Sequence, residues 1–530
     1  MFFNSRPLAL SIATFPLFST LGASIPEMVY GFGSIKPSPT LQWVPCFNEF
    51  TCAKLEVPLD YANTSLGTTS IAFIKIAGTN ATEESESILL NPGGPGGSGV
   101  QLLLTYASLT SQLFGPQYNY VGFDPRGVNN SGLVLDCFSG NADARAAFNK
   151  LHRIGATNVS SDSLINQFYS APIYGDWCNN AVDNNSPFSY YVTTPAVAQD
   201  MLTYIEAEAK SMGRPVDEAK LWYYGISYGT VIGTTFASLF PERIGRMVLD
   251  GVEDSREYYT NDWRVDLTQD DEAIQAFSEY CYQGGPANCS FWGPSPEDIS
   301  SRFDKVIDDL LHAPVPLSGF ENGNPPSLVT YSDMKALLIS AIYDPLTSYP
   351  KMAHILHRIE QGDYSSLAGL FHSYDITGDA GNVIKCVDSY TRNSLITIGD
   401  WVEYVTNTTM TSRYLGDIYP QFAETILCKG PLPASSNHTS FPIVFASNTI
   451  DPVTALVSAY DMSEQFPGSV VIKQEAVGHS VAGQGGSPCY WGHIQAYFAG
   501  TVPLSNITCP QQLVPFRDNG PQTVAQMKVR

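Results

Sequence analysis

The chain has 530 residues, with 28 Lys or Arg against 51 Asp or Glu and a formal net charge of −23 at pH 7. This length is sufficient for a large core and an additional domain. The strong negative charge, without a basic cluster that could follow a phosphate backbone, argues against nucleic acid as a partner.

The first 24 residues are predicted to be a secretory signal peptide. Arg6 precedes a largely apolar run over 7–21, and the small residues Gly22-Ala23-Ser24 offer a cleavage site. The apolar run is too short to span a bilayer comfortably, although a buried N-terminal helix is an alternative. No later stretch reaches 18 uninterrupted apolar residues. We therefore expect a secreted, extracellular protein with no membrane contact after signal removal.

The cysteines and the glycosylation motifs also indicate an oxidising exterior. Ten cysteines without a C-x-x-C motif or a zinc-like Cys/His spacing favour a disulfide framework and no metal. Sequence leaves the connectivity open. Near neighbours can pair as Cys46–Cys52, Cys137–Cys178, Cys281–Cys289, Cys386–Cys428 and Cys489–Cys509. Motifs that favour N-glycans occur at Asn63, Asn80, Asn129, Asn158, Asn184, Asn288, Asn407, Asn437 and Asn506.

Short β-type runs dominate residues 55–125, and a glycine-rich loop, NPGGPGGSG at 91–99, lies between two of them. Its glycines match G-x-G-x-x-G, and the next apolar run ends in Asp124, as in a dinucleotide-binding loop. However, Pro92 and Pro95 each remove an N–H donor that a phosphate cradle would use. No Lys followed by Ser or Thr completes a P-loop. We therefore do not expect this loop to bind a nucleotide.

From about residue 190 the pattern changes to alternating helices and strands. The expected elements are a helix over 194–213 that Thr194 caps, a strand over 221–224, a helix over 231–240 and a strand over 246–250. Strand, helix and strand in short succession predict a parallel sheet with crossover helices.

This alternation stops between about residues 255 and 430, where the sequence is mainly helical and contains four of the cysteines. It returns with apolar runs over 441–446 and 469–473. We interpret the interruption as a helical cap inserted into one α/β domain. The predicted organisation is a signal peptide (1–24), the N-terminal part of the core (25–254), the cap insertion (255–430) and the C-terminal part of the core (431–530).

A candidate nucleophile lies at Gly225-Ile226-Ser227-Tyr228-Gly229, between the strand over 221–224 and the following helix. A serine on a sharp strand-to-helix turn needs small flanking residues, because the backbone is strained and passes close to its neighbours. A plain glycine-rich turn is the alternative, but the strand before and the helix after favour a nucleophilic role for Ser227.

A nucleophilic serine needs a base, and the base needs an acid that orients it. Asp451 follows the strand over 441–446, and His479 follows the strand over 469–473, which we take as the final one. The order serine, acid, histidine is the one found with this strained turn. The other histidines lack such a position, and His493 lies in an expected helix. Asp250, which also ends a strand, is the rival acid, although we expect it to be structural.

The glycine-rich loop then acquires a different role. Acyl transfer places negative charge on a carbonyl oxygen, and fixed backbone N–H groups stabilise it. The turn supplies one donor from Tyr228, and the loop supplies the other, from Gly94 or less favourably Gly93.

Five motifs in order resemble the tripeptidyl-aminopeptidase-like branch of the α/β-hydrolase peptidases, relatives of proline iminopeptidase. They are NPGGPGGSG at 91–99, GFDPRG at 122–127, YGISYGT at 224–230, LDGV at 249–252, and the C-terminal pair DPVT at 451–454 with GHS at 478–480, which is similar to the TAP-like domain. The match runs from about Cys46 to Cys509. It implies an α/β-hydrolase fold with a cap, and a secreted serine exopeptidase without metal or cofactor. Glu253-Asp254-Ser255-Arg256 departs from the apolar-Asp-Pro stretch common in this family, which affects cap entry and substrate preference.

We expect the substrate to be a peptide or a small molecule. An aminopeptidase must distinguish a free α-ammonium, and a desolvated carboxylate does so most directly. The candidates at the cap entry are Glu253, Asp254, Asp270, Asp271 and Glu272, although solvated surface charge is the ordinary role of such residues. The alternatives are an esterase or amidase for small non-peptide compounds, and a catalytically silent binding protein. The last is disfavoured because no member of the triad is missing.

Overall fold

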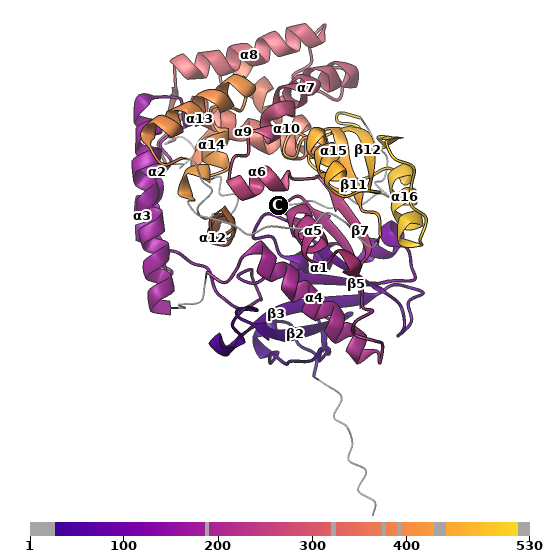
Figure 1. Cartoon of the computed structure of the whole chain (residues 1–530). Helices are drawn as coiled ribbons and strands as arrows, with labels where there is room; N and C mark the ends of the chain where they lie inside the picture. Colours follow the sequence, from indigo (N-terminus) through magenta and orange to yellow (C-terminus); the bar gives the residue numbers. More distant parts are fainter. Residues whose placement is uncertain are drawn as a thin grey trace, which may run out of the picture.

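The protein is described by a computed structural model that covers residues 27–185, 190–319, 325–373, 378–389, 395–428 and 441–517. The predicted signal peptide lies outside these residues. The main feature is a ten-stranded sheet with the order β1-β2-β3-β5-β4-β6-β7-β11-β12-β13 (Figure 1). A mainly helical domain covers one end of this sheet.

The sheet begins with an antiparallel part and continues as a parallel one. The strands are β1 (Val44–Cys46), β2 (Phe50–Pro58), β3 (Thr68–Ala77), β4 (Ser87–Asn91), β5 (Asn119–Asp124), β6 (Leu221–Ile226), β7 (Ile244–Asp250), β11 (Val444–Ile450), β12 (Val470–Val477) and β13 (Ile507–Pro510). Pairs β1–β2, β2–β3 and β3–β5 are antiparallel, and every pair from β5 to β13 is parallel. The predicted mostly parallel sheet with crossover helices is confirmed.

Helices cover both faces of the sheet. They are α1 (Gly99–Phe114), α4 (Thr194–Ser211), α5 (Tyr228–Leu239), α15 (Leu456–Gln465) and α16 (Pro488–Phe498). Successive residues of a strand point to opposite faces, and in β4 Leu89 packs with α4, α5 and α15, whereas Ile88 and Leu90 pack with α1 and α16. Burial on both faces explains why β4 is apolar without alternation.

The mainly helical domain lies between β7 and β11 in the sequence and has its own apolar core. Its elements are α6 (Ser255–Thr260), η4 (Val265–Gln269), α7 (Asp270–Gly284), α8 (Pro296–His312), β8 (Val315–Leu317), β9 (Ser327–Val329), α9 (Tyr331–Tyr343), α10 (Pro345–Glu360), α11 (Leu370–Ser373), α12 (Gly378–Ser389), α13 (Ile398–Thr411), α14 (Tyr419–Phe422) and η7 (Thr425–Leu427). We refer to this domain as the cap.

Two earlier helices, α2 (Ala142–His152) and α3 (Ser161–Asn185), also pack against the cap (Figure 1). Ala171 of α3 shares an apolar cluster with Trp401 of α13, and the Trp401 indole N–H donates to the Leu164 carbonyl oxygen at 3.2 Å. Arg153 forms an ion pair with Glu424. The helical part above the sheet is therefore built from two stretches of chain, whereas we expected one, 255–430.

Some element boundaries also differ from the prediction. Thr193, not Thr194, caps α4. Helix α5 begins at Tyr228, directly after the candidate nucleophile, not at Val231. The expectation that His479 follows the final strand was wrong, because β13 adds one more strand beyond β12. Four residues at a sheet edge give too short a pattern to recognise in the sequence.

All five expected disulfides are present, so the predicted framework is confirmed. They join Cys46–Cys52, Cys137–Cys178, Cys281–Cys289, Cys386–Cys428 and Cys489–Cys509. Among the motifs expected to carry N-glycans, the side chains of Asn63, Asn80, Asn129, Asn158, Asn288 and Asn506 are exposed, and Asn407 is half-buried. The Asn184 side chain and Asn437 lie outside the described parts. The helices among the described residues are too short or too polar to span a bilayer.

The Cys489–Cys509 disulfide joins α16 to the edge strand β13. Replacing both cysteines with Ser should lower the free energy of unfolding by about 3 kcal/mol, because the bond closes a stretch of 20 residues. Urea unfolding of the oxidised protein and the double variant measures this difference. A loss below about 1 kcal/mol would contradict this stabilising role of the disulfide. Peptide mapping that finds either cysteine free or paired elsewhere would contradict the disulfide itself.

Candidate active site

Ser227 occupies a strained turn between β6 and α5. Its backbone has φ 56° and ψ −128°, a conformation that non-glycine residues rarely adopt. The Ser227 N–H donates to the Asp250 carbonyl oxygen at 3.0 Å, and the Thr230 N–H donates to the Ser227 carbonyl oxygen at 2.7 Å. A Cβ on Gly225 would lie 2.5 Å from the Gly229 carbonyl oxygen. The G-x-S-x-G sequence is therefore required by close backbone packing.

The glycine-rich loop between β4 and α1 lies directly against this turn. A Cβ on Gly93 would lie 2.8 Å from the Tyr228 backbone nitrogen and 3.0 Å from the Ser227 Cβ, so only glycine fits. The Gly93 N–H donates to Asn91 Oδ1 at 2.9 Å, whereas the Gly94 N–H has no acceptor among the described residues. These contacts favour Gly94 over Gly93 as a donor for a ligand oxygen near Ser227.

The rest of this loop is supported by Asp124, the acid that resembled a ribose ligand in the sequence. Asp124 is buried and accepts hydrogen bonds from Ser98 Oγ at 2.5 Å and from the Val100 N–H at 3.2 Å. It also accepts from the backbone and side chain of Asn130. The carboxylate thus fixes the start of α1 and is occupied by the protein itself.

Asp451 and His479 lie together at the ends of two adjacent parallel strands, β11 and β12. His479 Nδ1 lies 3.2 Å from Asp451 Oδ1, and both side chains are buried. Asp451 also accepts from the N–H groups of Val453, Thr454 and Ser480 and from Thr454 Oγ1. A carboxylate at Nδ1 favours the tautomer in which Nε2 carries no hydrogen. His479 Nε2 is buried and finds no partner in the described chain.

The end of β7 brings the serine and the histidine to the same place. Asp250 holds the Ser227 N–H through its carbonyl oxygen, and a Cβ on the next residue, Gly251, would lie 3.1 Å from His479 Cε1. No Ser227–His479 hydrogen bond is formed in the described chain. Such contacts are often long without substrate and shorten in the complex.

The rival acid, Asp250, has a different environment. Its carboxylate accepts from the N–H groups of Val481 and Ala482 at 2.7 and 2.8 Å and from the Tyr224 hydroxyl at 2.7 Å. Burial raises the pKa of Asp250 to about 6. Asp250 therefore fixes the segment after His479, and Asp451 is the acid in contact with the imidazole.

Three of the five acids proposed at the cap entry do not suit a substrate ammonium. Asp254 caps α6 and forms a 2.6 Å ion pair with Arg256. Asp271 accepts from Ser412 Oγ and from two backbone amides of the same segment. Glu272 is exposed. The first two are satisfied within the protein, and the third is surface charge.

Glu253 and Asp270 are different, because they are buried and incompletely paired. Glu253 Oε1 and both carboxylate oxygens of Asp270 accept no hydrogen bond from the described residues. Asp266, which we did not predict, joins them: its Oδ2 accepts from the Tyr419 hydroxyl at 2.7 Å, and its Oδ1 has no such partner. Burial first, and then repulsion among acids that include Asp451, raises the pKa of all three carboxyls well above the ordinary range.

Asp266 escaped prediction because no motif surrounds it. Its four-residue spacing from Asp270 across η4 and the start of α7 was the available signal. Asp266 interacts electrostatically with both Glu253 and Asp270, and we call these three residues the buried acid cluster. Such a cluster favours a cationic ligand, because an unpaired buried carboxylate is costly and a cation would compensate it.

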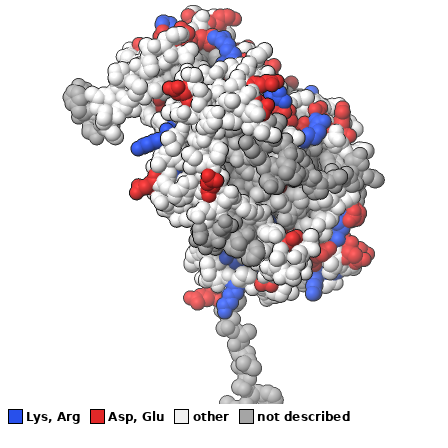
Figure 2. All heavy atoms as spheres, turned by 60° about the vertical axis from the view of Figure 1, so that its left-hand side comes forward, with Lys and Arg blue, Asp and Glu red and all other residues white. Residues whose placement is uncertain are grey.

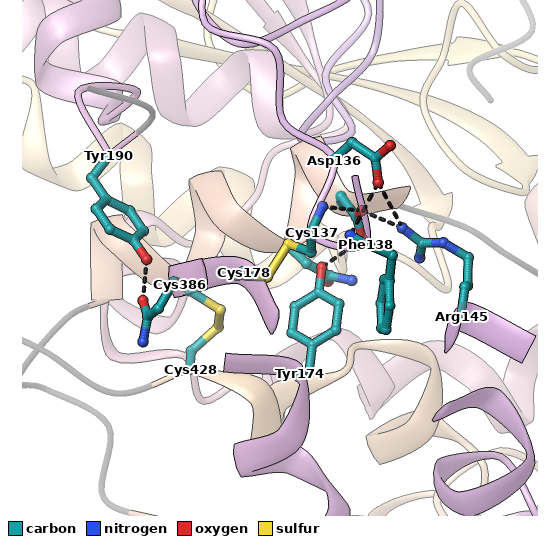
Figure 3. The surroundings of a disulfide bond; sticks show 12 residues. Asp136, Cys137, Phe138, Arg145, Tyr174, Cys178, Tyr190, Cys386 and Cys428 are labelled. Carbon is teal, nitrogen blue, oxygen red and sulfur yellow. Dashed lines mark hydrogen bonds and ion pairs between the residues drawn. A yellow bond between two sulfur atoms is a disulfide. The ribbon is translucent and has the colours of Figure 1, made fainter. Parts of the chain in front are cut away.

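A cavity of about 980 Å³ is a separate feature of the described residues. It lies among α3, α12 and η7 and is lined mainly by apolar side chains such as Phe168, Val383 and Leu427. Two disulfides, Cys137–Cys178 and Cys386–Cys428, lie beside it (Figure 3). None of its described lining residues belongs to the group around Ser227.

Two further features are candidate binding sites: basic side chains on the surface, which could bind nucleic acid, and a group of residues that could bind a metal. On the face in Figure 2, basic side chains are scattered and do not gather into a patch. Cys489, His493 and Cys509 lie close enough to bind a metal, but the two cysteines are joined in a disulfide and supply no thiolate.

Comparisons with known proteins agree with this geometry. A family model described as alpha/beta hydrolase fold matches residues 86–289, and one described as TAP-like protein matches residues 428–509. The chain is 27% identical over 500 residues to "Serine protease Hip1" of Mycobacterium tuberculosis, covering 88% of this chain and 91% of that relative. It is 24% identical over 508 residues to "Tripeptidyl aminopeptidase" of Streptomyces lividans, covering 90% and 87%.

Other similar proteins carry different names. "Carboxylesterase B" of Mycobacterium tuberculosis is 26% identical over 483 residues, covering 86% of each chain. Among solved structures, a hydrolase from Pseudomonas aeruginosa matches with a TM-score of 0.35 and 12% identity, covering 84% of this chain and 98% of that one. Both peptidase and esterase names therefore occur among relatives of similar coverage.

The two acids at the strand ends should respond differently to amidation. Asp451→Asn should keep the fold but lower turnover on the order of 10⁴-fold, because the amide no longer favours the required His479 tautomer and charge. Asp250→Asn should mainly lower the free energy of unfolding, by about 1–3 kcal/mol, because buried amides lose their acceptor. Steady-state kinetics and urea unfolding measure the two effects. The opposite ranking would move the acid to position 250.

Proposed function

Because the chain belongs to the α/β hydrolases, as a serine hydrolase with a TAP-like C-terminal domain, we propose that it is a secreted exopeptidase of the aminopeptidase or tripeptidyl aminopeptidase type. The buried acid cluster is the observation that carries this proposal. Two contacts support a position of this cluster next to the proposed catalytic residues. The Glu253 N–H donates at 3.0 Å to Oγ1 of Thr230, three positions after Ser227. Gln269, the neighbour of Asp270 in the sequence, donates at 2.8 Å to the Thr449 carbonyl oxygen, two positions before Asp451. The similarity to a serine protease and to a tripeptidyl aminopeptidase along most of the chain supports it.

In the proposed mechanism, Ser227 Oγ attacks the scissile carbonyl carbon while His479 Nε2 accepts the hydroxyl proton. Asp451 keeps the imidazole in the productive tautomer and stabilises the imidazolium. The backbone N–H groups of Tyr228 and Gly94 donate to the oxyanion. His479 then protonates the leaving amine, an acyl-enzyme forms on Ser227, and a water molecule activated by His479 releases the acid product.

The buried acid cluster would select the substrate. A free N-terminal α-ammonium can donate to three acceptors and neutralise a carboxylate in a site shielded from water, where the attraction is strong. An acetylated N-terminus has no charge and leaves Glu253, Asp266 and Asp270 uncompensated. The proposed specificity is therefore for peptides with free N-termini, processed from that end.

A hydrolase for small esters or amides is the second candidate, and the similarity to "Carboxylesterase B" favours it. The same serine, histidine and acid would perform that reaction. The buried acid cluster distinguishes the two proposals, because an uncharged ester has no group that would compensate it.

Secretion and glycosylation are part of the proposal. Five disulfides suit an oxidising compartment. The exposed asparagines of six glycosylation motifs could carry glycans without disturbing the core.

The nucleophile can be tested by Ser227→Ala, which removes only the hydroxyl. We expect loss of several powers of ten in turnover and loss of labelling by a fluorophosphonate probe, with an unchanged unfolding transition. Intact-mass analysis should show one adduct on the parent protein and none on the variant. Full labelling of the variant would show that the nucleophile lies elsewhere.

Substrate selection can be tested by Glu253→Gln, with Glu272→Gln as the control because Glu272 is an exposed acid of the same region. Glu253→Gln should raise KM for free peptides at least tenfold and leave hydrolysis of simple esters within about twofold, because one charge-assisted hydrogen bond to the ammonium is lost. Glu272→Gln should change neither. N-acetylated peptides should be poor substrates of the parent. Equal rates on free and acetylated peptides would reject the aminopeptidase proposal and favour the small-molecule hydrolase.

The raised pKa values add a pH dependence to this test. Glu253, Asp266 and Asp270 should take up protons at a higher pH than ordinary carboxyls, so KM for free peptides should rise on mild acidification. A carboxyl with a raised folded-state pKa stabilises the fold below its unfolded pKa, and this stability is lost as the pH rises through the folded pKa. Glu253→Gln should therefore raise the unfolding temperature more at pH 7.5 than at pH 4. The same change at both pH values would contradict a buried, unpaired Glu253.

A further inference from the structure

A buried carboxylate of the cap, Asp388, reaches the domain that contains the sheet. It lies near the C-terminal end of α12 and is 1% exposed. Its Oδ1 accepts from the Thr194 N–H at 2.8 Å, and its Oδ2 accepts from Thr194 Oγ1 at 2.5 Å and from the Tyr258 hydroxyl at 2.8 Å. One cap residue thereby contacts the start of α4 and the helix α6 that follows β7.

Thr194 extends this contact to the residue after the proposed nucleophile. Its Oγ1 lies 2.5 Å from the Tyr228 hydroxyl oxygen. A threonine hydroxyl has one hydrogen, and that hydrogen is donated to Asp388. The Tyr228 hydroxyl must therefore be the donor to Thr194, which gives a directed chain from Tyr228 through Thr194 to Asp388. All three side chains are buried, and the Tyr228 ring packs against Tyr258 with centroids 5.3 Å apart.

The acceptor end of this chain is fixed within the cap. Cys386, two positions before Asp388 in α12, forms a disulfide with Cys428, which directly follows η7 (Figure 3). At the other end of α12, Asp379 accepts from the Tyr174 hydroxyl at 2.8 Å and forms an ion pair with Arg145. Asp388 is thus presented by a helix that is held at both ends.

We propose that Asp388 is a positioning residue for the oxyanion site: through Thr194 it fixes the Tyr228 side chain, and with it the direction of the Tyr228 backbone N–H. This inference rests on the proposed function, in which that N–H donates to the oxyanion. Donors at such a site act by being held in place before charge develops, so a small displacement lowers the rate of the chemical step more than substrate binding. Turnover then requires that the cap be positioned so that Asp388 contacts Thr194.

The test compares variants that each remove one buried hydroxyl. Tyr228→Phe and Thr194→Val break the chain without adding charge, whereas Thr194→Ser keeps the hydroxyl. Tyr174→Phe is the matched control, because it also removes a buried tyrosine hydroxyl bound to a carboxylate of α12. Asp379 keeps its ion pair with Arg145 and its hydrogen bond from the Cys137 N–H in this variant, so the helix end stays held. Active sites are titrated with the fluorophosphonate, so that kcat refers to folded, reactive protein.

We expect Tyr228→Phe and Thr194→Val each to lower kcat, and the rate constant of fluorophosphonate labelling, by about tenfold at unchanged KM. Thr194→Ser should restore most of the loss, and Tyr174→Phe should stay within twofold of the parent. A kcat within twofold of the parent for both chain-breaking variants, a rise in KM alone, or an equal loss in Tyr174→Phe would overturn the inference. Failure of the proposed function gives different results: a wrong nucleophile leaves Ser227→Ala labelled, and a wrong substrate class gives equal rates of the parent protein on free and N-acetylated peptides.

Discussion

The strained turn at Ser227 is the constraint on which the rest of the site depends. A positive φ at a non-glycine residue costs about 1–3 kcal/mol and persists only where its surroundings enforce it. Here the end of β7 supplies the acceptor for the Ser227 N–H, and Gly93 and Gly225 allow backbones to approach where a Cβ could not fit. Three successive parallel strands, β7, β11 and β12, then place Asp250, Asp451 and His479 beside this turn. The sheet order is therefore what makes the chemistry possible.

Buried carboxylates near the site fall into two groups, which differ in whether the protein supplies their hydrogen bonds. Asp250 and Asp451 are buried but satisfied by backbone amides, so they fix loops and orient the imidazole. Glu253, Asp266 and Asp270 are buried and incompletely satisfied, which lowers stability at neutral pH. We infer that the fold tolerates this cost because a substrate cation compensates it. The same three residues would then lower the stability of the fold and provide the specificity for a cationic substrate.

Sequence reasoning succeeded where the signal was local. The strained turn, the glycine-rich loop and the ends of β11 and β12 follow from short motifs next to apolar runs, and neighbouring cysteines paired as their spacing predicted. Features that depend on contacts between distant segments could not be predicted. The Asp388–Thr194 hydrogen bond joins residues 194 positions apart, and helices α2 and α3 join a cap whose other helices follow residue 254. Asp266 carries no motif, and its four-residue spacing from Asp270 was the available signal among the 51 acids of the chain.

Binding of the substrate ammonium by the buried acid cluster should be linked to proton release, which calorimetry can measure. Titration calorimetry of the Ser227→Ala protein with a free tripeptide, in two buffers of different ionisation enthalpy at one pH, gives the number of protons exchanged on binding. If carboxyls with raised pKa values ionise to pair with the ammonium, the free tripeptide should release protons and its N-acetylated counterpart should release none. Equal proton exchange for both peptides, or equal affinity for both, would contradict binding of the ammonium by the buried acid cluster.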